Sequence, residues 1–166
     1  LFERVGELDE TLGSYLEDVE FGLRCAVAGY AGRYVPTAVA YHAGSATLGS
    51  WNPEIVRLIA RNQLLIVAKH YPLELIWRWS WAILAGQLLW GLVAARHGQI
   101  RAFCRGKWEA LLRFRRLRKH RRFDPRVKQV LARSEQRIYE LQRATGFARY
   151  WRWYFRLVWM KSEQLS

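Results

Sequence analysis

The feature that most limits the possible folds is an apolar stretch over residues 75–95. Its clearly polar members are Arg78, Ser80 and Gln87. A helix of this length is about 30 Å long, enough to cross the hydrocarbon core of a bilayer. Four tryptophans lie in it, as in an interfacial aromatic belt: Trp77, Trp79, Trp81 and Trp90. Residues 73–98 are predicted to form a membrane-inserting or re-entrant helix, and a buried helix of a soluble core is the alternative.

Charge is distributed unevenly along the chain. Residues 1–74 carry six basic and nine acidic side chains, a net charge of −3, whereas residues 75–166 carry 21 basic and five acidic ones, a net charge of +16. Hydrophobic residues make up 51% of the chain, which excludes a disordered polycation. The two cysteines exclude a disulfide-dense scaffold and a four-cysteine zinc module. The basic half fits an anionic membrane surface or a nucleic acid.

The C-terminal segment combines arginines with aromatic residues. Arg149, Arg152 and Arg156 are spaced at i, i+3 and i+7 and therefore share one face of a helix. Trp151 and Trp153 lie between them. A helix with a cationic face and bulky aromatic side chains is typical of segments that lie in the headgroup layer. Residues 99–166 are therefore predicted to be a helical tail that contacts an anionic membrane surface.

Local signals predict where several helices begin and end. Residues 52–53, Asn followed by Pro, form a capped start, and this predicts a helix that runs to about His70. Residues 124–125, Asp followed by Pro, predict another start, and Gly146 predicts the end of that helix.

Three carboxylates gather next to a further predicted helix start. Glu17 and Asp18 are followed by Glu20, which is placed to pair with Arg24 one helical turn later. The N-terminus of a helix favours negative charge, so these groups can stay ionised there. An ionised Asp is a competent general base when an acceptor hydroxyl comes within hydrogen-bonding reach. Acidic capping without a catalytic role is the alternative.

A histidine marks a second region of chemical interest. Residues 33–35 and 38–41 are short apolar segments and are predicted to form strands. His42 follows the second of them and precedes a turn of small residues. Neutral imidazole is a good ligand for a divalent metal ion. A structural role is the alternative, because no nearby residues complete a metal site.

Several of these features belong to a series of short motifs. The series is Val5-Gly6-Glu7-Leu8-Asp9-Glu10, Tyr15-Leu16-Glu17-Asp18-Val19-Glu20-Phe21-Gly22-Leu23-Arg24, Gly29-Tyr30, Tyr34-Val35-Pro36, Val39-Ala40-Tyr41-His42-Ala43-Gly44-Ser45-Ala46-Thr47, Arg61-Asn62 and Lys69-His70-Tyr71-Pro72. Their order and spacing resemble the family 2 glycosyltransferases, and most of all the rhamnosyltransferase-like branch that builds bacterial cell-surface polysaccharides. The resemblance covers residues 3–72.

The resemblance implies a GT-A fold, an α/β domain that binds a nucleotide-sugar donor with Mg²⁺ or Mn²⁺. Asp18 corresponds to the general base on the acceptor hydroxyl, with Glu17 beside it, in a displacement that inverts the anomeric carbon. His42, 24 residues after Asp18, corresponds to a metal ligand. Residues 1–72 would be the C-terminal, acceptor-side portion of the catalytic domain. The family-level expectation is rhamnose, moved to a cell-surface glycan or a lipid-linked acceptor at the cytoplasmic face of the inner membrane.

Two departures from the family pattern limit what this chain is expected to do. Glu7 and Leu8 stand where the family has a glycine and an aromatic residue, which alters the loop and leaves Asp9-Glu10 intact. The Asp-x-Asp motif that binds the metal and the diphosphate does not occur in residues 1–166. We therefore expect a fragment of a longer enzyme that is inactive by itself.

Two other functions were weighed against the transferase. A nucleic-acid-binding module would use the arginine-rich run at 113–122, but no RRM, KH or zinc-finger pattern supports it, and the apolar stretch argues against it. A noncatalytic membrane scaffold is the other alternative, and the presence of Glu17, Asp18 and His42 argues against that reading.

Overall fold

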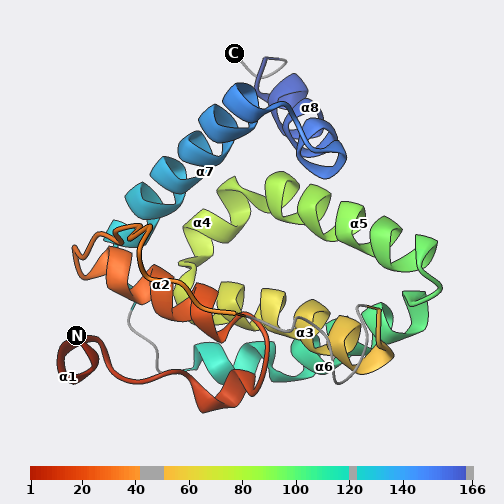
Figure 1. Ribbon diagram of the computed structural model, residues 1–166. Coiled ribbons are helices and arrows are strands. Elements are labelled where there is room, and N and C mark those ends of the chain that lie inside the picture. Colours follow the sequence, from red (N-terminus) through yellow and green to blue (C-terminus); the bar gives the residue numbers. More distant parts are fainter. Residues whose placement is uncertain (42–50, 120–122, 164–166) are drawn as a thin grey trace. The chain divides into compact units, whose positions relative to one another are not determined.

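The structure is a computed structural model that describes residues 1–41, 51–119 and 123–163, with side chains up to Trp159 (Figure 1). In chain order its elements are α1 (Phe2–Val5), the 3₁₀ helix η1 (Glu10–Leu12), α2 (Glu17–Val27), α3 (Pro53–His70), α4 (Leu73–Arg78), α5 (Ser80–Arg96), α6 (Ile100–Arg118), α7 (Arg126–Thr145) and α8 (Arg149–Glu163). They belong to two compact units. The first unit comprises residues 1–69 and 101–121, and the second comprises residues 70–100 and 122–166.

All regular structure within the described ranges is helical, so the predicted α/β GT-A fold with short strands is wrong for this chain. The segments 33–35 and 38–41 are exposed and irregular. Ala38 N donates to Val35 O at 3.0 Å, which closes a turn rather than a ladder. The apolar pattern of a strand is a local property, whereas a strand is stable only beside a partner that accepts its hydrogen bonds. The described chain brings no such partner to these segments.

The apolar stretch over 75–95 is interrupted, so the expectation of one continuous helix is corrected. Trp79 lies between α4 and α5 with φ −105° and ψ 17°, outside the usual helical range. The longer part, α5, has 17 residues, fewer than the roughly 20 that a bilayer core requires. Among the helices that the structure describes, none combines the length and the apolar character of a membrane span.

The two predicted helix starts are confirmed. Asn52 Oδ1 accepts a hydrogen bond from Glu54 N at 2.8 Å where α3 begins. Asp124 Oδ1 accepts one from Arg126 N at 2.8 Å where α7 begins, and Gly146, at φ 85°, follows its last residue. The side-chain oxygens satisfy backbone N–H groups that have no partner within the helix, which is why these starts are readable from the sequence.

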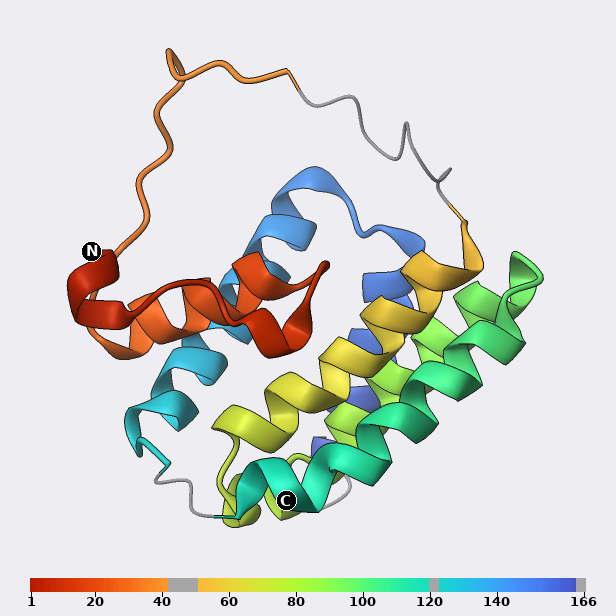
Figure 2. The same ribbon diagram turned by 90° about the horizontal axis from the view of Figure 1, so that it is seen from below.

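The first unit is built around α3 and α6, which run side by side (Figure 2). Their backbones come closest at Gly106, where an added Cβ would lie 2.2 Å from Arg57 O. Gly106 has no side chain, so the backbones of α3 and α6 can pack directly against each other here. A side chain at this position would clash with Arg57 O and force the two helices apart. The buried core beside this contact consists of Leu12, Leu65, Ile66 and Ala110, with Leu16, Leu23, Leu64 and Leu117 packed against it.

The second unit contains α4, α5, α7 and α8. α5 and α8 lie against each other, and Tyr150 Oη donates to Gly86 O at 3.2 Å. α7 joins them through Tyr139, whose ring centroid lies 5.2 Å from that of Phe155 and 4.3 Å from that of Trp159. Aromatic pairs at these distances add to the area that they bury. Much of the aromatic content of the C-terminal half is therefore used in packing.

Candidate functional site

The turn that leads into α2 has an unusual backbone. Tyr15 and Leu16 have φ of 71° and 67°, in the left-handed region that side chains other than glycine rarely adopt. Such residues cost about 1–3 kcal/mol each and persist where the surroundings hold them. The turn directly precedes Glu17 and Asp18, so the position of these two carboxylates depends on whatever holds this backbone.

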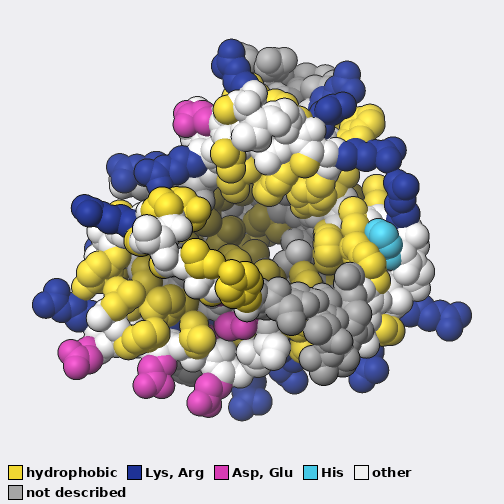
Figure 3. Space-filling model, viewed as in Figure 1, with side chains coloured by type: hydrophobic (Ala, Val, Ile, Leu, Met, Phe, Trp, Pro, Cys, Tyr) yellow, Lys and Arg dark blue, Asp and Glu magenta, His cyan; other side chains and the backbone are white. Residues whose placement is uncertain are grey.

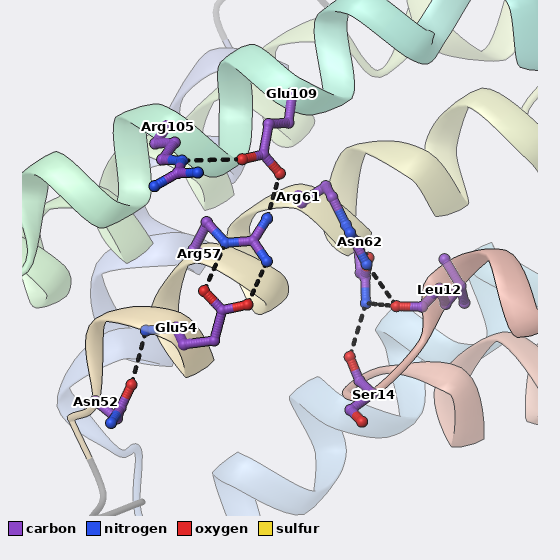
Figure 4. A network of polar contacts seen from close by, with 9 residues as sticks. All are labelled: Leu12, Ser14, Asn52, Glu54, Arg57, Arg61, Asn62, Arg105 and Glu109. Carbon is purple, nitrogen blue, oxygen red and sulfur yellow. Dashed lines mark hydrogen bonds and ion pairs between the residues drawn. The ribbon is translucent and has the colours of Figure 1, made fainter.

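Asn62 of α3 holds the turn. Its side chain is fully buried, and Nδ2 lies 3.0 Å from Leu12 O, 3.0 Å from Ser14 O and 2.6 Å from Tyr15 O. The contacts with Leu12 and Ser14 are drawn in Figure 4. Backbone carbonyls in a turn have no ladder partner, and a buried amide donor replaces the water that they would otherwise bind.

Arg61 fixes the orientation of Asn62. Arg61 Nε donates to Asn62 Oδ1 at 2.9 Å, and its Nη2 donates to Leu12 O at 2.6 Å. The Arg61 side chain is buried, and burial together with the nearby positive charges of Arg113 and Arg57 lowers the pKa of its guanidinium. Arg61 and Asn62, which are neighbours in α3, thus both donate hydrogen bonds to the segment before α2.

The three carboxylates at the start of α2 have different surroundings. Glu20 is buried and pairs with Arg24, whose Nε lies 2.9 Å from Glu20 Oε2, as the sequence predicted. Arg24 also donates to Val5 O and Glu7 O, at 2.6 Å each, and so holds the N-terminal segment against α2. Glu20 therefore has a structural role.

Glu17 and Asp18 have fewer contacts. Asp18 is exposed, and its Oδ1 accepts a hydrogen bond from Val19 N at 2.8 Å. Glu17 Oε2 is buried, and no hydrogen-bond partner for it is found among the described residues. The residue that caps α2 is Leu16, whose side chain makes no capping hydrogen bond. The second carboxylate oxygen of Asp18 is not used in the hydrogen bond with Val19 N and lies on an exposed residue.

Lys69, near the end of α3, bonds to the loop before η1. Its buried ammonium group pairs with Asp9 Oδ2 and donates to Thr11 Oγ1. Asp9 Oδ1 in turn accepts from Thr11 N at 3.0 Å. Partial burial alone would raise the pKa of Asp9, but the hydrogen bonds from Lys69 and Thr11 lower it to about 2. The ion pair is therefore intact at neutral pH.

The Asp9–Lys69 pair predicts a loss of stability in acid. Because the pKa of Asp9 falls from 3.8 to about 2 on folding, the pair stabilises the fold above pH 4, and this contribution is lost as pH falls toward 2. The shift corresponds to about 2 kcal/mol. The free energy of unfolding, measured in urea at several pH values, should fall as pH is lowered from 4 toward 2. Asp9→Asn should remove this dependence on pH, whereas Glu3→Gln should not. Equal slopes for Asp9→Asn and the native chain would contradict the assignment.

Sequence reasoning did not assign roles to Arg61, Asn62 and Lys69. Asn62 and Lys69 occur at the same helical spacing as the buried residues Leu65 and Ile66, so they lie on the apolar face of α3. A polar residue at an apolar position usually has a buried partner. That signal was present in the sequence, but the identity of the partner was not.

The predicted metal ligand cannot be placed. His42 lies outside the described residues, so its role as a ligand stays a prediction. Among the residues that are described, no group of three or more His, Cys, Asp or Glu side chains is arranged to hold a metal ion.

The nine residues predicted to contact a membrane all belong to the second unit. Five are exposed: Trp77, Arg149, Arg152, Trp153 and Arg156. Four are half-buried: Trp79, Trp81, Trp90 and Trp151. Trp81 Nε1 donates to Leu157 O at 2.9 Å, and the Trp151 ring stacks on Phe155 with centroids 5.9 Å apart. Contact with a membrane stays a prediction for this set.

Charged side chains of both signs lie on the folded surface. On the face drawn in Figure 3, acidic side chains gather over the N-terminal segment that holds α1 and η1, and Lys and Arg side chains project around α7 and α8 and elsewhere. The first unit joins the N-terminal segment to the basic helix α6, so the division of charge along the sequence does not coincide with the division into units.

Comparison with models of protein families, with curated protein sequences and with solved structures gave no match for this chain. The functional interpretation therefore depends on the residues and their geometry.

Proposed function

We propose that this chain is the acceptor-side part of an inverting glycosyltransferase that moves a sugar from a nucleotide-sugar donor to a hydroxyl of a cell-surface glycan or a lipid-linked acceptor. The observation that carries the proposal is a convergence of motifs around one turn. Asn62 bonds to the turn before Asp18, Lys69 bonds to Asp9 in the loop before η1, and Arg24 bonds to the N-terminal segment beside α2. These residues come from the separate motifs on which the family resemblance rests.

Asp18 acts as the general base in this proposal. The acceptor hydroxyl donates its proton to Asp18 while its oxygen attacks the anomeric carbon, and the bond from that carbon to the diphosphate oxygen breaks. Attack from the side opposite the leaving group inverts the configuration. Asp18 lies in the first turn of α2 and is exposed, so an acceptor hydroxyl can come within hydrogen-bonding reach of its carboxylate. Glu17, half-buried beside Asp18, is proposed to orient this turn or to contact the bound acceptor.

A divalent cation, Mg²⁺ or Mn²⁺, belongs to the proposal and would neutralise the charge of the departing nucleoside diphosphate. The described residues do not assemble a site that fits such an ion, so no step is assigned to a metal ligand among them. His42 is retained as the proposed ligand.

The proposed place of action is the cytoplasmic face of the inner membrane, where a lipid-linked acceptor would be reached. The support is the excess of basic residues over residues 75–166, because each Lys or Arg near an anionic surface contributes about 1 kcal/mol to attachment. The five exposed Trp and Arg residues of the second unit are the proposed contacts.

The test is a transfer assay with the full-length protein that contains this chain. Labelled nucleotide sugars, with dTDP-rhamnose among them, are offered with the lipid and glycan fractions of the host as acceptors. We expect labelled product whose anomeric configuration is opposite to that of the donor, with transfer stopped by a chelator and restored by Mg²⁺ or Mn²⁺. Product of retained configuration, or a folded protein that transfers no sugar from any donor, would contradict the proposal.

A further inference from the structure

The helix α6 is held in the first unit by the face that carries Gly106, Lys107 and Ala110. Ala110 is buried, and Gly106 packs against the backbone of α3. Lys107 Nζ donates to Ala60 O at 2.7 Å and to Gln63 Oε1 at 2.9 Å. Burial lowers the pKa of Lys107 to about 7. These contacts fix the rotation of α6 about its own axis.

The opposite face of α6 exposes large apolar side chains. Trp108 is 63% exposed, Leu111 55% and Leu112 66%, and Cys104 is exposed one turn earlier. Residues at spacings of three, four and seven share one helix face, so this group forms a continuous apolar strip. The helix thus turns a half-buried lysine toward α3 and exposes the tryptophan next to it, the reverse of the usual distribution.

Cations lie on both ends of the apolar strip. Exposed Arg101 and Arg105 precede it, and exposed Arg115, Arg116 and Lys119 follow it. The acidic residue of α6 is Glu109, which pairs with Arg57 of α3 and, at 3.1 Å, with Arg105 (Figure 4). The outward face therefore has an apolar centre, cationic ends and no acidic side chain without an ion pair.

We propose that this face of α6, centred on Trp108, Leu111 and Leu112, is a docking surface for an anionic phospholipid bilayer. The helix would lie in the plane of the interface, with the three apolar side chains among the acyl chains and the arginines at the phosphates. The inference deepens the membrane association proposed above, because it adds a second contact surface, in the same unit as Asp18. It is tested without sugar transfer, so its failure can be told apart from failure of the transferase.

Two features favour a bilayer over a protein as the occupant. Aliphatic side chains flanked by Arg match the depth profile of a membrane interface, where apolar atoms lie below the headgroups and long cationic side chains extend up to them. The cations also occur at both ends of the strip, and the acidic residue between them, Glu109, is paired with Arg57 and Arg105, which suits a uniformly anionic plane. A protein partner would have to repeat this single sign of charge over the whole face.

The first experiment measures co-sedimentation of the 166-residue chain with vesicles of phosphatidylcholine, with and without added phosphatidylglycerol. We expect binding to the anionic vesicles that weakens as salt is raised. Combined Trp108→Gln, Leu111→Gln and Leu112→Gln should weaken binding at least about tenfold, and Arg115→Gln with Arg116→Gln should weaken it about fivefold per charge. Circular dichroism checks that each variant folds.

Matched variants on other helices control for nonspecific effects. Leu84→Gln, Leu88→Gln and Leu92→Gln remove three exposed leucines of α5, and Arg133→Gln with Arg137→Gln remove two exposed charges of α7. If the α5 triple variant loses binding while the α6 triple variant keeps it, the assignment to α6 is wrong. Equal losses for the two arginine pairs would show that net charge, rather than this face, drives binding.

The second experiment measures the surroundings of this face of α6 with a fluorescent probe and needs no substitution within the strip. In a Cys25→Ser variant, an environment-sensitive fluorophore is attached to the exposed Cys104. A blue shift with anionic vesicles, quenched by lipids that carry spin labels in the acyl chains, is the expected result. A shift that follows protein concentration instead, or protection of Cys104 without lipid in the full-length protein, would show that a protein surface covers the face and would overturn the proposal.

Discussion

Replacing Asp18 with Asn in the proposed transferase is expected to lower the rate of sugar transfer about 10²–10⁴-fold, the usual contribution of a general base. Asn has the same size and keeps an oxygen for the hydrogen bond from Val19 N, so the start of α2 should be unchanged. It cannot accept the proton of the attacking hydroxyl. The measurement is turnover at saturating donor, together with the affinity for the donor, which should stay near the native value.

Two further variants make the result specific. Glu3→Gln removes a carboxylate that is exposed in α1 and should leave transfer unchanged. Glu17→Gln keeps a hydrogen-bonding group at the buried position and should affect acceptor KM more than kcat. Near-normal turnover of Asp18→Asn would exclude Asp18 as the base. If that variant also supports assembly of the surface glycan in cells, the noncatalytic scaffold becomes the better explanation.

Replacing Asn62 with Leu is expected to destabilise the first unit by about 2–5 kcal/mol, because two partly buried carbonyls, Ser14 O and Tyr15 O, lose their donor. Leu12 O keeps the hydrogen bond from Arg61. The left-handed backbone of Tyr15 and Leu16 would then lack its support. The midpoint of urea unfolding measures the effect, and sugar transfer by the proposed enzyme should fall with it because Asp18 is displaced.

Asn62→Asp separates the hydrogen-bond argument from simple packing. The substitution changes the volume little but directs a carboxylate at three carbonyl oxygens, so it should destabilise at least as much as Leu. Gln129→Leu, at an exposed position of α7, is the control and should shift the midpoint little. Native-like stability of Asn62→Asp would mean that the amide does not hold the turn.

The parts of the fold that could be predicted are those set by neighbouring residues. The starts of α3 and α7 depend on Asn52 and Asp124, whose side chains bond to N–H groups two residues away. The pairing of Glu20 with Arg24 spans one helical turn. The strands expected at 33–35 and 38–41 failed because a strand requires a partner distant in sequence, and the break at Trp79 is not marked by a proline or a glycine.

The sequence singles out candidate site residues, whose role stays a prediction, but not their arrangement. Glu17 and Asp18 could be identified from their clustering and from the motif order. Which carboxylate is available for chemistry depends on Arg24, and Arg24 is held by Val5 O and Glu7 O, contacts that no local pattern encodes. The same is true of Asn62, which reaches the turn across nearly fifty residues of sequence.

By itself, therefore, the sequence determined where the helices begin, how charge divides along the chain, and which acidic residues could serve as a base. The tertiary structure alone decided that Asp18 is exposed while Glu20 is buried, and that α6 turns Trp108 outward and Lys107 inward. The physical reason is the separation in sequence over which each interaction acts. Capping and helical pairing act within one or two turns, whereas the close approach at Gly106 and the hydrogen bonds of Asn62 depend on which distant backbone arrives beside them.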